Sequence, residues 1–581
     1  MTTHTVVNYS DIYPGPKPEL ATLLAGINSK IIVLLMAVVN AEVDGPGDAE
    51  TVQARITAII VQNFQPVERQ RIAAAIHSLR QKTGEGPVVL WGRRYVLAFM
   101  KYEFLHYQQG EAISTTPEQE LRIFKGYLLI VEKENTEDRQ ELALISKATA
   151  ATDPFKIEKI TWPFILKQFE TNQRANPASQ LYMVLALVAD AVNHPELRQA
   201  WKNLVERNGF PTLRIFLGSY YRLLTITQNR FPDGPYKVFS WITPEDIPPH
   251  LLNLSFDPAE FQADPKKQIN YLGLKEKPLF NCGDNRFAIL DRNYLINRAY
   301  MGTVFELYYK GGLEGKPPFR TFPDFKSYLA KNVSEKIVFQ SLFSWLFAGR
   351  KATLAFDDGS VDGHPDCMIT TKDSILLIEF KDYIFPGVIV EKYEFDLIKA
   401  HLDEKFIQTR DGKKKGISQI VSQIEWLPTT NAVQKHSKKG KKLKVYPVIV
   451  HTSFLYQMPG INSYLQRAFQ QQLAGVQVDG RLDIKDLTLI DLETFFEMLP
   501  FKKIGALRLV EFLERYHRLL ANRQKRLSTL LTQETLLASK ASFDEVFHTI
   551  YLREEAKVTS DEHGRRLTDS LGLSDVVLDS F

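Results

Sequence analysis

The sequence predicts a multidomain protein with an N-terminal all-α domain, an α/β domain built on a central mixed sheet, and C-terminal helices. Three observations lead to this prediction. Apolar residues recur at helical spacing through residues 1–230, seven prolines interrupt residues 229–268, and helical and strand patterns alternate from residue 324. Spacing distinguishes helix from strand, and the mixture of the two is typical of helices packed on a sheet.

Residues 1–230 are expected to form the helical domain. The region shows no fixed repeat period and no catalytic motif. We therefore expect a scaffold, or a domain that binds a protein partner. Short polar breaks separate six segments with apolar residues three or four positions apart, namely 20–39, 66–80, 88–107, 117–132, 179–192 and 213–227.

Residues 231–323 are expected to form a proline-rich linker and a small β element. Prolines break helices and favour turns. Two short apolar runs, 279–280 and 287–290, flank a Gly-Asp-Asn tripeptide at 283–285, and this pattern predicts a hairpin. Prolines at 317, 318 and 323 mark a second break before the next domain.

Residues 324–500 are expected to form the α/β domain, and residues 501–581 a C-terminal helical extension. Helices are expected at 325–347 and 416–427. A tight turn at 371–373 joins two of the strands. The expected strands are 352–356, 367–370, 375–381, 445–452 and 487–490.

Composition excludes several classes of protein. Cys282 and Cys367 are the only cysteines, too few for a disulfide framework or a cysteine-rich zinc site. No basic leader typical of a signal peptide opens the chain. The most apolar stretch, 31–39, has nine residues, whereas a membrane span needs ~20. We expect a cytoplasmic protein without a membrane partner. The HExxH, GxxxxGK[ST] and GxSxG motifs are absent from the sequence.

One short segment carries chemistry. A Pro-Asp pair at 365–366 precedes the tight turn, and Glu379-Phe380-Lys381 ends the strand that follows. Because strand side chains alternate between faces, Glu379 and Lys381 share one face and Phe380 takes the other. The run 375–378 is wholly apolar, which is typical of a buried central strand. A carboxylate and an ammonium at its end need compensation, which a divalent metal would provide.

This arrangement resembles the PD-(D/E)XK, or restriction-endonuclease-like, nuclease superfamily. The family pattern is Pro-Asp, a variable gap, and Asp/Glu-X-Lys on the next strand. The resemblance covers roughly residues 330–500 and implies a restriction-endonuclease-like fold for the α/β domain. It implies that Asp366 and Glu379, helped by the backbone carbonyl of Phe380, bind Mg²⁺, with Mn²⁺ as an alternative. It also implies that Lys381 orients or activates the attacking water and steadies charge on the phosphate.

The activity that the resemblance implies is that of a metal-dependent endonuclease or exonuclease. Its substrate would be nucleic acid, with DNA favoured over RNA. By association, nucleases with large accessory domains often belong to restriction, repair or phage-defence systems. The alternative, of another class, is a non-catalytic nucleic-acid-binding or scaffold subunit that retains the nuclease fold. The intact set of Asp366, Glu379 and Lys381 argues against that alternative.

Two flanking helices carry further candidates for the catalytic site. Glu335 lies on the apolar face of a helix, where family members often place an acidic residue; a capping or solvated glutamate is the alternative. Gln419 and Gln423 are four residues apart, off the apolar stripe of their helix. Family members often have a polar residue there, and solvated glutamines are the alternative.

Basic residues concentrate around the second of these helices. Residues 405–444 hold eleven Lys or Arg and two acidic residues, a local charge of +9 in a chain with a net charge of +4. Such a cluster favours contact with a polyanion, and a solvated loop is the alternative. The candidate contacts to phosphate, which carry no sequence information, are Lys413, Lys414, Lys415, Lys438, Lys439, Lys441 and Lys442.

Overall fold

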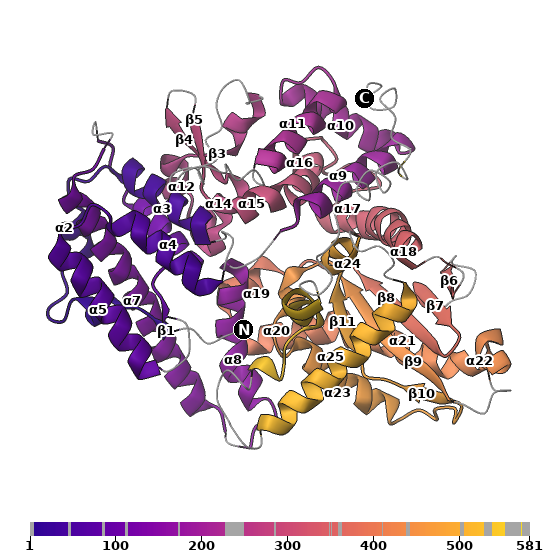
Figure 1. Ribbon diagram of the computed structural model, residues 1–581. Helices are drawn as coiled ribbons and strands as arrows, with labels where there is room; N and C mark the ends of the chain where they lie inside the picture. Colours follow the sequence, from indigo (N-terminus) through magenta and orange to yellow (C-terminus); the bar gives the residue numbers. More distant parts are fainter. Residues whose placement is uncertain are drawn as a thin grey trace.

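The protein has a helical half beside a half built on a mixed sheet, as the computed structural model shows (Figure 1). The predicted N-terminal helices and mixed sheet are confirmed. Among the described helices, none combines the length and the apolar character that crossing a membrane requires. The structure describes residues 5–43, 48–83, 88–110, 114–150, 152–171, 175–226, 249–283, 286–347, 349, 351–357, 363–409, 411–436, 442–499, 505–527, 537–551 and 571.

Several predicted segments lie outside the described residues. They include the first half of the proline-rich stretch (229–248), two residues of the predicted hairpin turn (284–285), and most of the C-terminal extension beyond residue 551.

In the described residues, the helical half contains five long helices and several short elements. The predicted helix at 20–39 is broken, because Gly26 has a φ of +74°, a left-handed conformation that glycine adopts without strain. α7 begins at a capping box formed by Thr116 and Gln119 and extends past its predicted end. The elements are β1 (Thr5–Val6), which pairs in parallel with β2 (Val88–Val89), and α1 (Tyr9–Ile12), α2 (Leu20–Leu24), α3 (Ser29–Val43), α4 (Ala49–Val61), α5 (Pro66–Thr83), α6 (Arg93–Leu105) and α7 (Pro117–Ala148).

A small sheet packs on these helices. β4 (Leu279–Gly283) and β5 (Arg286–Ile289) form the antiparallel pair that the sequence predicts, and β3 (Ser255–Phe256) runs parallel to β4. Phe256, Phe280 and Tyr294 join the core of α3, α6 and α7. The accompanying helical turns are η2 (Pro249–Leu254), α12 (Pro258–Ala263), α13 (Pro265–Gln268), η3 (Ile269–Tyr271), α14 (Leu272–Glu276), α15 (Arg292–Asn297), η4 (Arg298–Gly302) and α16 (Thr303–Tyr309).

The central sheet has six strands in the order β10-β9-β8-β7-β6, with β11 also paired to β9. β7 runs antiparallel to both β6 and β8, whereas β8, β10 and β11 run parallel to β9. The strands are β6 (Ala352–Phe356), β7 (Cys367–Thr371), β8 (Ser374–Lys381), β9 (Leu443–His451), β10 (Leu482–Ile484) and β11 (Thr488–Asp491).

Helices cover both faces of this sheet. Leu376 and Ile378 of β8 face the core that contains η5 and α18, while Ile375 and Leu377 face the core that contains α21. Every residue of β8 is therefore buried. The helices are α17 (Phe322–Leu329), η5 (Ala330–Phe339), α18 (Gln340–Phe347), α19 (Gly387–Lys392), α20 (Phe395–Leu402), η6 (Asp403–Ile407), α21 (Gly416–Trp426), η7 (Leu427–Thr429), α22 (Asn431–His436), η9 (Phe454–Gln457), α23 (Ile461–Leu473), α24 (Leu492–Met498), α25 (Ala506–Leu527), α27 (Phe543–Val546) and η10 (Phe547–Tyr551).

Four more helices of residues 1–230 pack with the sheet half. They are α8 (Lys156–Thr171), α9 (Pro177–Val192), α10 (Pro195–Arg207) and α11 (Leu213–Ile226). The apolar residues of α9–α11 share one core with the sheet, and Trp162 of α8 joins the core of α20, α21 and α23. The core thus continues across the boundary expected at residue 230. Apolar periodicity identifies a buried face, but it does not identify what covers that face.

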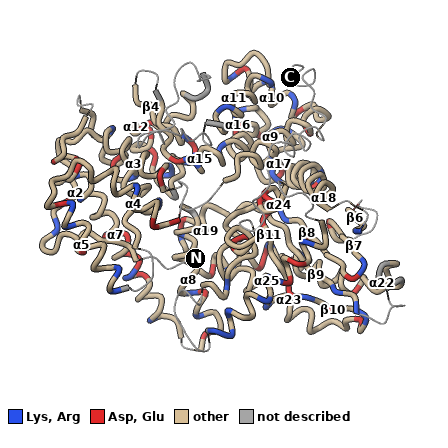
Figure 2. The backbone as a smooth tube through the Cα atoms, viewed as in Figure 1, with Lys and Arg blue, Asp and Glu red and all other residues tan. Residues whose placement is uncertain are grey.

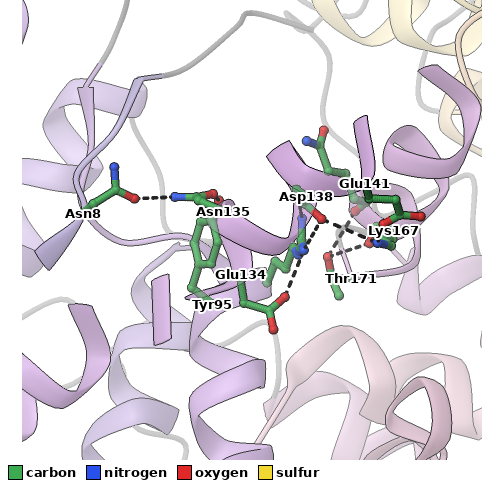
Figure 3. A network of polar contacts seen from close by, with 10 residues as sticks. Asn8, Tyr95, Glu134, Asn135, Asp138, Glu141, Lys167 and Thr171 are labelled. Atoms are coloured by element: carbon green, nitrogen blue, oxygen red, sulfur yellow. Dashed lines mark hydrogen bonds and ion pairs between the residues drawn. The ribbon is translucent and has the colours of Figure 1, made fainter. Parts of the chain in front are cut away.

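Polar contacts hold α8 to the helical half (Figure 3). Asp138 of α7 pairs with Arg94 of α6 at 2.5 Å and with Lys167 of α8 at 3.5 Å. Lys167 also pairs with Glu141 at 2.5 Å. Because α8 packs on the sheet half as well, it links the two halves of the molecule.

Candidate active site

The β7–β8 hairpin places the Pro-Asp and Glu-X-Lys segments side by side. Cys367, the first residue of β7, pairs with Ile378 of β8. Asp366 precedes it and therefore lies next to the end of β8. The backbone N–H of Phe380 donates to Asp366 Oδ2 at 2.6 Å. This hydrogen bond fixes the Asp366 carboxylate against the strand that carries Glu379 and Lys381.

The two carboxylates converge on one ammonium. Lys381 Nζ lies 2.7 Å from Glu379 Oε2 and 3.7 Å from Asp366 Oδ2. The Glu379 side chain is fully buried, and the Lys381 side chain is 9% exposed. Phe380 takes the other face, where its ring stacks on Phe339. The structure thus brings together the three side chains that the sequence selects, with the alternation expected of a strand.

Gln423 is the second contact of Glu379. Its Nε2 donates to Glu379 Oε1 from α21, and Gln423 is buried rather than solvated. Its own Oε1 has no hydrogen-bond partner among the described residues, and neither has Oε1 of half-buried Gln419, one turn earlier. Buried amide oxygens of this kind usually bond to something. α21 therefore carries two buried hydrogen-bond acceptors without a described partner, and the one on Gln423 lies beside β8.

Glu335 of η5 adds a third carboxylate to the electrostatics of this site. Burial and, to a smaller extent, Asp366 raise its pKa to about 7, although Lys381 opposes the shift. Burial likewise raises the pKa of Glu379 despite Lys381 beside it. Burial works to lower the pKa of Lys381, but Glu379 and Asp366 outweigh it and the pKa is raised. Asp366 raises the pKa of both Glu335 and Glu379, so the carboxylates repel one another and an added cation would relieve this repulsion.

The oxygen ligands of this site suit a hard divalent cation that takes only a few of its ligands from the protein. Mg²⁺ is commonly held by one or two carboxylates together with substrate phosphate, and Asp366 and Glu379 supply two. Within the described ranges, no group of three or more His, Cys, Asp or Glu residues is arranged to hold a metal ion. A metal would therefore depend on these two carboxylates, the Phe380 carbonyl predicted as a ligand, and its substrate.

The sequence analysis missed Asp382, the residue after Lys381. Asp382 Oδ2 accepts hydrogen bonds from Lys326 Nζ and Ser334 Oγ, each at 2.6 Å, and its Oδ1 accepts from Thr452 Oγ1 at 2.6 Å. Burial works to raise the pKa of Asp382, but Lys326 and the hydrogen bonds lower it. This network fixes the end of β8 to α17, η5 and β9. An acidic residue directly after a buried strand was the available signal.

The basic candidates lie unevenly around the site. Lys413 and Lys414 are exposed, and Lys414 Nζ donates to Ser422 Oγ at 2.7 Å. Lys415 is half-buried; burial lowers its pKa, as do Lys413 and Lys381, which places Lys415 on the side of the catalytic candidates. Lys442 is exposed. Three of the predicted contacts, Lys438, Lys439 and Lys441, lie outside the described residues.

Basic side chains also occur far from this site. Figure 2 shows Lys and Arg positions in the helical half as well as around the sheet. Charge by itself therefore does not locate a binding surface. Comparisons of the chain with protein-family models, with curated proteins and with solved structures found no match.

Proposed function

We propose that the protein is a metal-dependent nuclease of the restriction-endonuclease-like kind, with Asp366, Glu379 and Lys381 as its catalytic residues. One observation carries the proposal. Carboxylates from two adjacent positions of a hairpin converge on a single buried ammonium, and Asp366 also raises the pKa of a third carboxyl group, that of Glu335. Repulsion between carboxylates does not serve a structural ion pair, whereas a bound cation relieves it.

The roles of the residues follow from their positions. Asp366, Glu379 and the Phe380 carbonyl would hold Mg²⁺ or Mn²⁺, which when bound offsets phosphate charge and lowers the pKa of water. Lys381, held in place by both carboxylates, donates hydrogen bonds to the attacking water and a phosphate oxygen. Water adds to phosphorus and the P–O bond to the leaving sugar oxygen breaks. Gln423 keeps Glu379 turned toward Lys381.

The proposed substrate is nucleic acid, with DNA favoured. Lys415 supports this proposal because it lies toward Lys381, and exposed Lys413 and Lys414 precede it on the same loop. Contacts of lysines with phosphates hold a strand without reading its sequence. A protein partner bound by the helical half, and a place in a restriction, repair or phage-defence system, rest on the superfamily resemblance and belong to the same proposal.

The experiment that tests the function is a cleavage assay on the full chain. Labelled single-stranded and double-stranded DNA and RNA are incubated with the protein in Mg²⁺, in Mn²⁺ and in EDTA. We expect cleavage of DNA that EDTA abolishes, and its loss in Asp366→Asn. The matched control is Asp373→Asn, which changes an exposed carboxylate in the β7–β8 turn. Binding of nucleic acid without cleavage under every condition would instead support a non-catalytic subunit.

A further inference from the structure

A cavity of about 210 Å³ lies at the carboxyl ends of β8, β9 and β11. Its floor is formed by the residues that follow these three parallel strands, and its other walls come from α9, η4 and α17. In open α/β sheets, ligands bind in the crevice outside the carboxyl ends of the strands. This cavity occupies the corresponding position and joins the sheet to helices from both flanking segments of the chain.

The cavity carries more carboxylates than cations. Asp382, Asp491 and Glu493 line it, and Lys326 is its only basic lining residue in the described part of the chain. Lys326 is already paired with Asp382 at 2.6 Å. Within the described residues, neither Asp491 nor Glu493 forms an ion pair with Lys or Arg. Positive charge is therefore missing from the side of the cavity formed by β11 and α24.

Among the described residues, the Glu493 carboxyl group accepts hydrogen bonds only from neutral groups. Its Oε1 accepts from the Asn176 backbone N–H at 2.5 Å and from Ser179 Oγ at 3.0 Å. Burial and neighbouring Asp491 raise the pKa of Glu493 to about 8. Asp491 accepts from Gln457 Nε2 at 2.8 Å. A cation beside these two carboxylates would meet acceptors that are already oriented.

Two half-buried side-chain amides of the lining each have one atom without a hydrogen-bond partner among the described residues. Gln180 Oε1 on α9 and Nδ2 of Asn297 at the end of α15 are buried, and neither has a hydrogen-bond partner among the described residues. Both residues line the cavity. Buried polar atoms in native proteins usually have a partner. An N–H group of a ligand would donate the hydrogen bond that the side-chain carbonyl of Gln180 lacks.

Hydroxyl groups and apolar side chains make up the rest of the lining, and the apolar side chains define the body of the ligand. Met183, Met301, Phe385, Phe454 and Phe496 are among the wall residues. Aromatic faces attract ammonium and guanidinium groups, and methionine fits irregular apolar groups. A bare metal ion does not suit this site, because no three acidic, His or Cys side chains in the described ranges converge to hold one.

We propose that this cavity binds a small organic cation, with an ammonium or guanidinium group at Asp491, Glu493 and Gln180 and an aliphatic body against the aromatic wall. The cavity adjoins the catalytic candidates through Tyr383 but does not contain them. Asp382 pairs with Lys326 and Ser334 on the face of β8 opposite Glu379 and Lys381. Binding can be measured without any cleavage, so the failure of the nuclease proposal would leave this one standing.

The test is calorimetric titration of the full chain with agmatine, which carries both cationic groups on a four-carbon chain. We expect a Kd of about 0.1 mM or tighter, since ligands of this size gain only a fraction of a kcal/mol per heavy atom. Pentanoate, an anion of similar length, should not bind. At pH 9, above the pKa of Glu493, Glu493→Gln keeps the shape but removes the charge and should weaken binding about tenfold or more. Glu511→Gln, which changes an exposed carboxylate of α25 outside the cavity lining, should not change the Kd.

A second variant guards against misfolding. Met301→Trp fills the cavity and should abolish agmatine binding while the melting temperature without ligand stays unchanged. No agmatine binding up to about 10 mM, or equal binding of pentanoate, would overturn the proposal. So would an unchanged Kd in both Glu493→Gln and Met301→Trp, because agmatine would then bind elsewhere.

Discussion

The helical half and the sheet half both bury charged side chains, but they satisfy them differently. In the helical half, Asp291 is paired with Arg93 and also accepts hydrogen bonds from Asn40 Nδ2 at 2.9 Å and from the backbone N–H of Tyr294 at 2.8 Å. In the sheet half, Asp366 and Glu379 share one lysine. A charge pair that serves the fold is balanced and saturated with hydrogen bonds. The imbalance around Lys381 is what makes that site a candidate for function.

The same contrast exists at the carboxyl end of β8. Glu379 and Asp382 are three residues apart, yet burial raises the pKa of Glu379 while Lys326, Ser334 and Thr452 lower that of Asp382 against the effect of burial. Asp382 therefore fixes the end of the strand, and Glu379 is left available. Burial alone does not separate a structural carboxylate from a functional one; the number of donors around it does.

The largest expected effect is on cleavage. Replacing Lys381 by Met keeps the length of the side chain but removes the charge that both carboxylates face. We expect the cleavage rate to fall by about 10²–10³-fold or more, the usual cost of removing a group that stabilises charge in the transition state. Single-turnover assays with saturating DNA measure it. A Lys381→Met protein that cleaves at the wild-type rate would contradict the assignment of this site.

The next effect is on stability of the helical half. Replacing Arg93 by Met leaves Asp291 buried without its cation, and we expect the free energy of unfolding to fall by about 3–5 kcal/mol. Denaturant unfolding followed by circular dichroism measures it. The control is Arg80→Met, which breaks an exposed pair with Glu50 and should cost less than about 1 kcal/mol. Equal effects of the two substitutions would remove the distinction between the halves.

The sequence predicts more of the fold than of the contacts around the site. Strand alternation placed Glu379 and Lys381 on one face, because the period of a strand is fixed by local geometry. The helical period likewise placed Gln423 off the apolar stripe of α21. The pairing of Asp382 with Lys326, 56 residues earlier, depends on which helix covers which face. So does the packing of α9–α11 on the sheet, and a single sequence does not encode that choice in any local pattern.

The pH dependence of stability offers another test of this comparison, because Glu103 is an exception to the balanced buried charges of the helical half. Glu103 is buried on α6, and burial raises its pKa to about 7, with a hydrogen bond from Ser29 opposing the shift. The folded state thus binds a proton that the unfolded state releases. The contribution of Glu103 to the free energy of unfolding is fully present below its unfolded pKa of about 4.3. This contribution is lost as pH rises through the folded pKa of about 7.

Replacing Glu103 by Gln should remove that loss. At pH 8 the variant should be more stable than the wild type by about 1–3 kcal/mol, because one pKa unit corresponds to about 1.4 kcal/mol. At pH 4 the two proteins should be nearly equally stable. Thermal unfolding across this range measures the difference. A difference that does not change with pH would show that Glu103 is charged in the folded protein.

The smallest expected effect concerns the lysines beside the proposed site. If Lys413, Lys414 and Lys415 contact a phosphate backbone, each contributes a slope of about −0.9 to log K against log salt for duplex DNA. Replacing all three by Ala should flatten the slope by up to about three units and weaken unrelated sequences equally. Lys414 is held by Ser422 and Lys415 is half-buried, so exposed Lys413 should account for the clearest single loss. Lys372→Ala, in the turn at the opposite end of β8, is the matched control. Fluorescence anisotropy from low to moderate salt measures the slopes. A triple variant with the wild-type slope would place the nucleic acid elsewhere on the protein, even if the catalytic assignment of Lys381 holds.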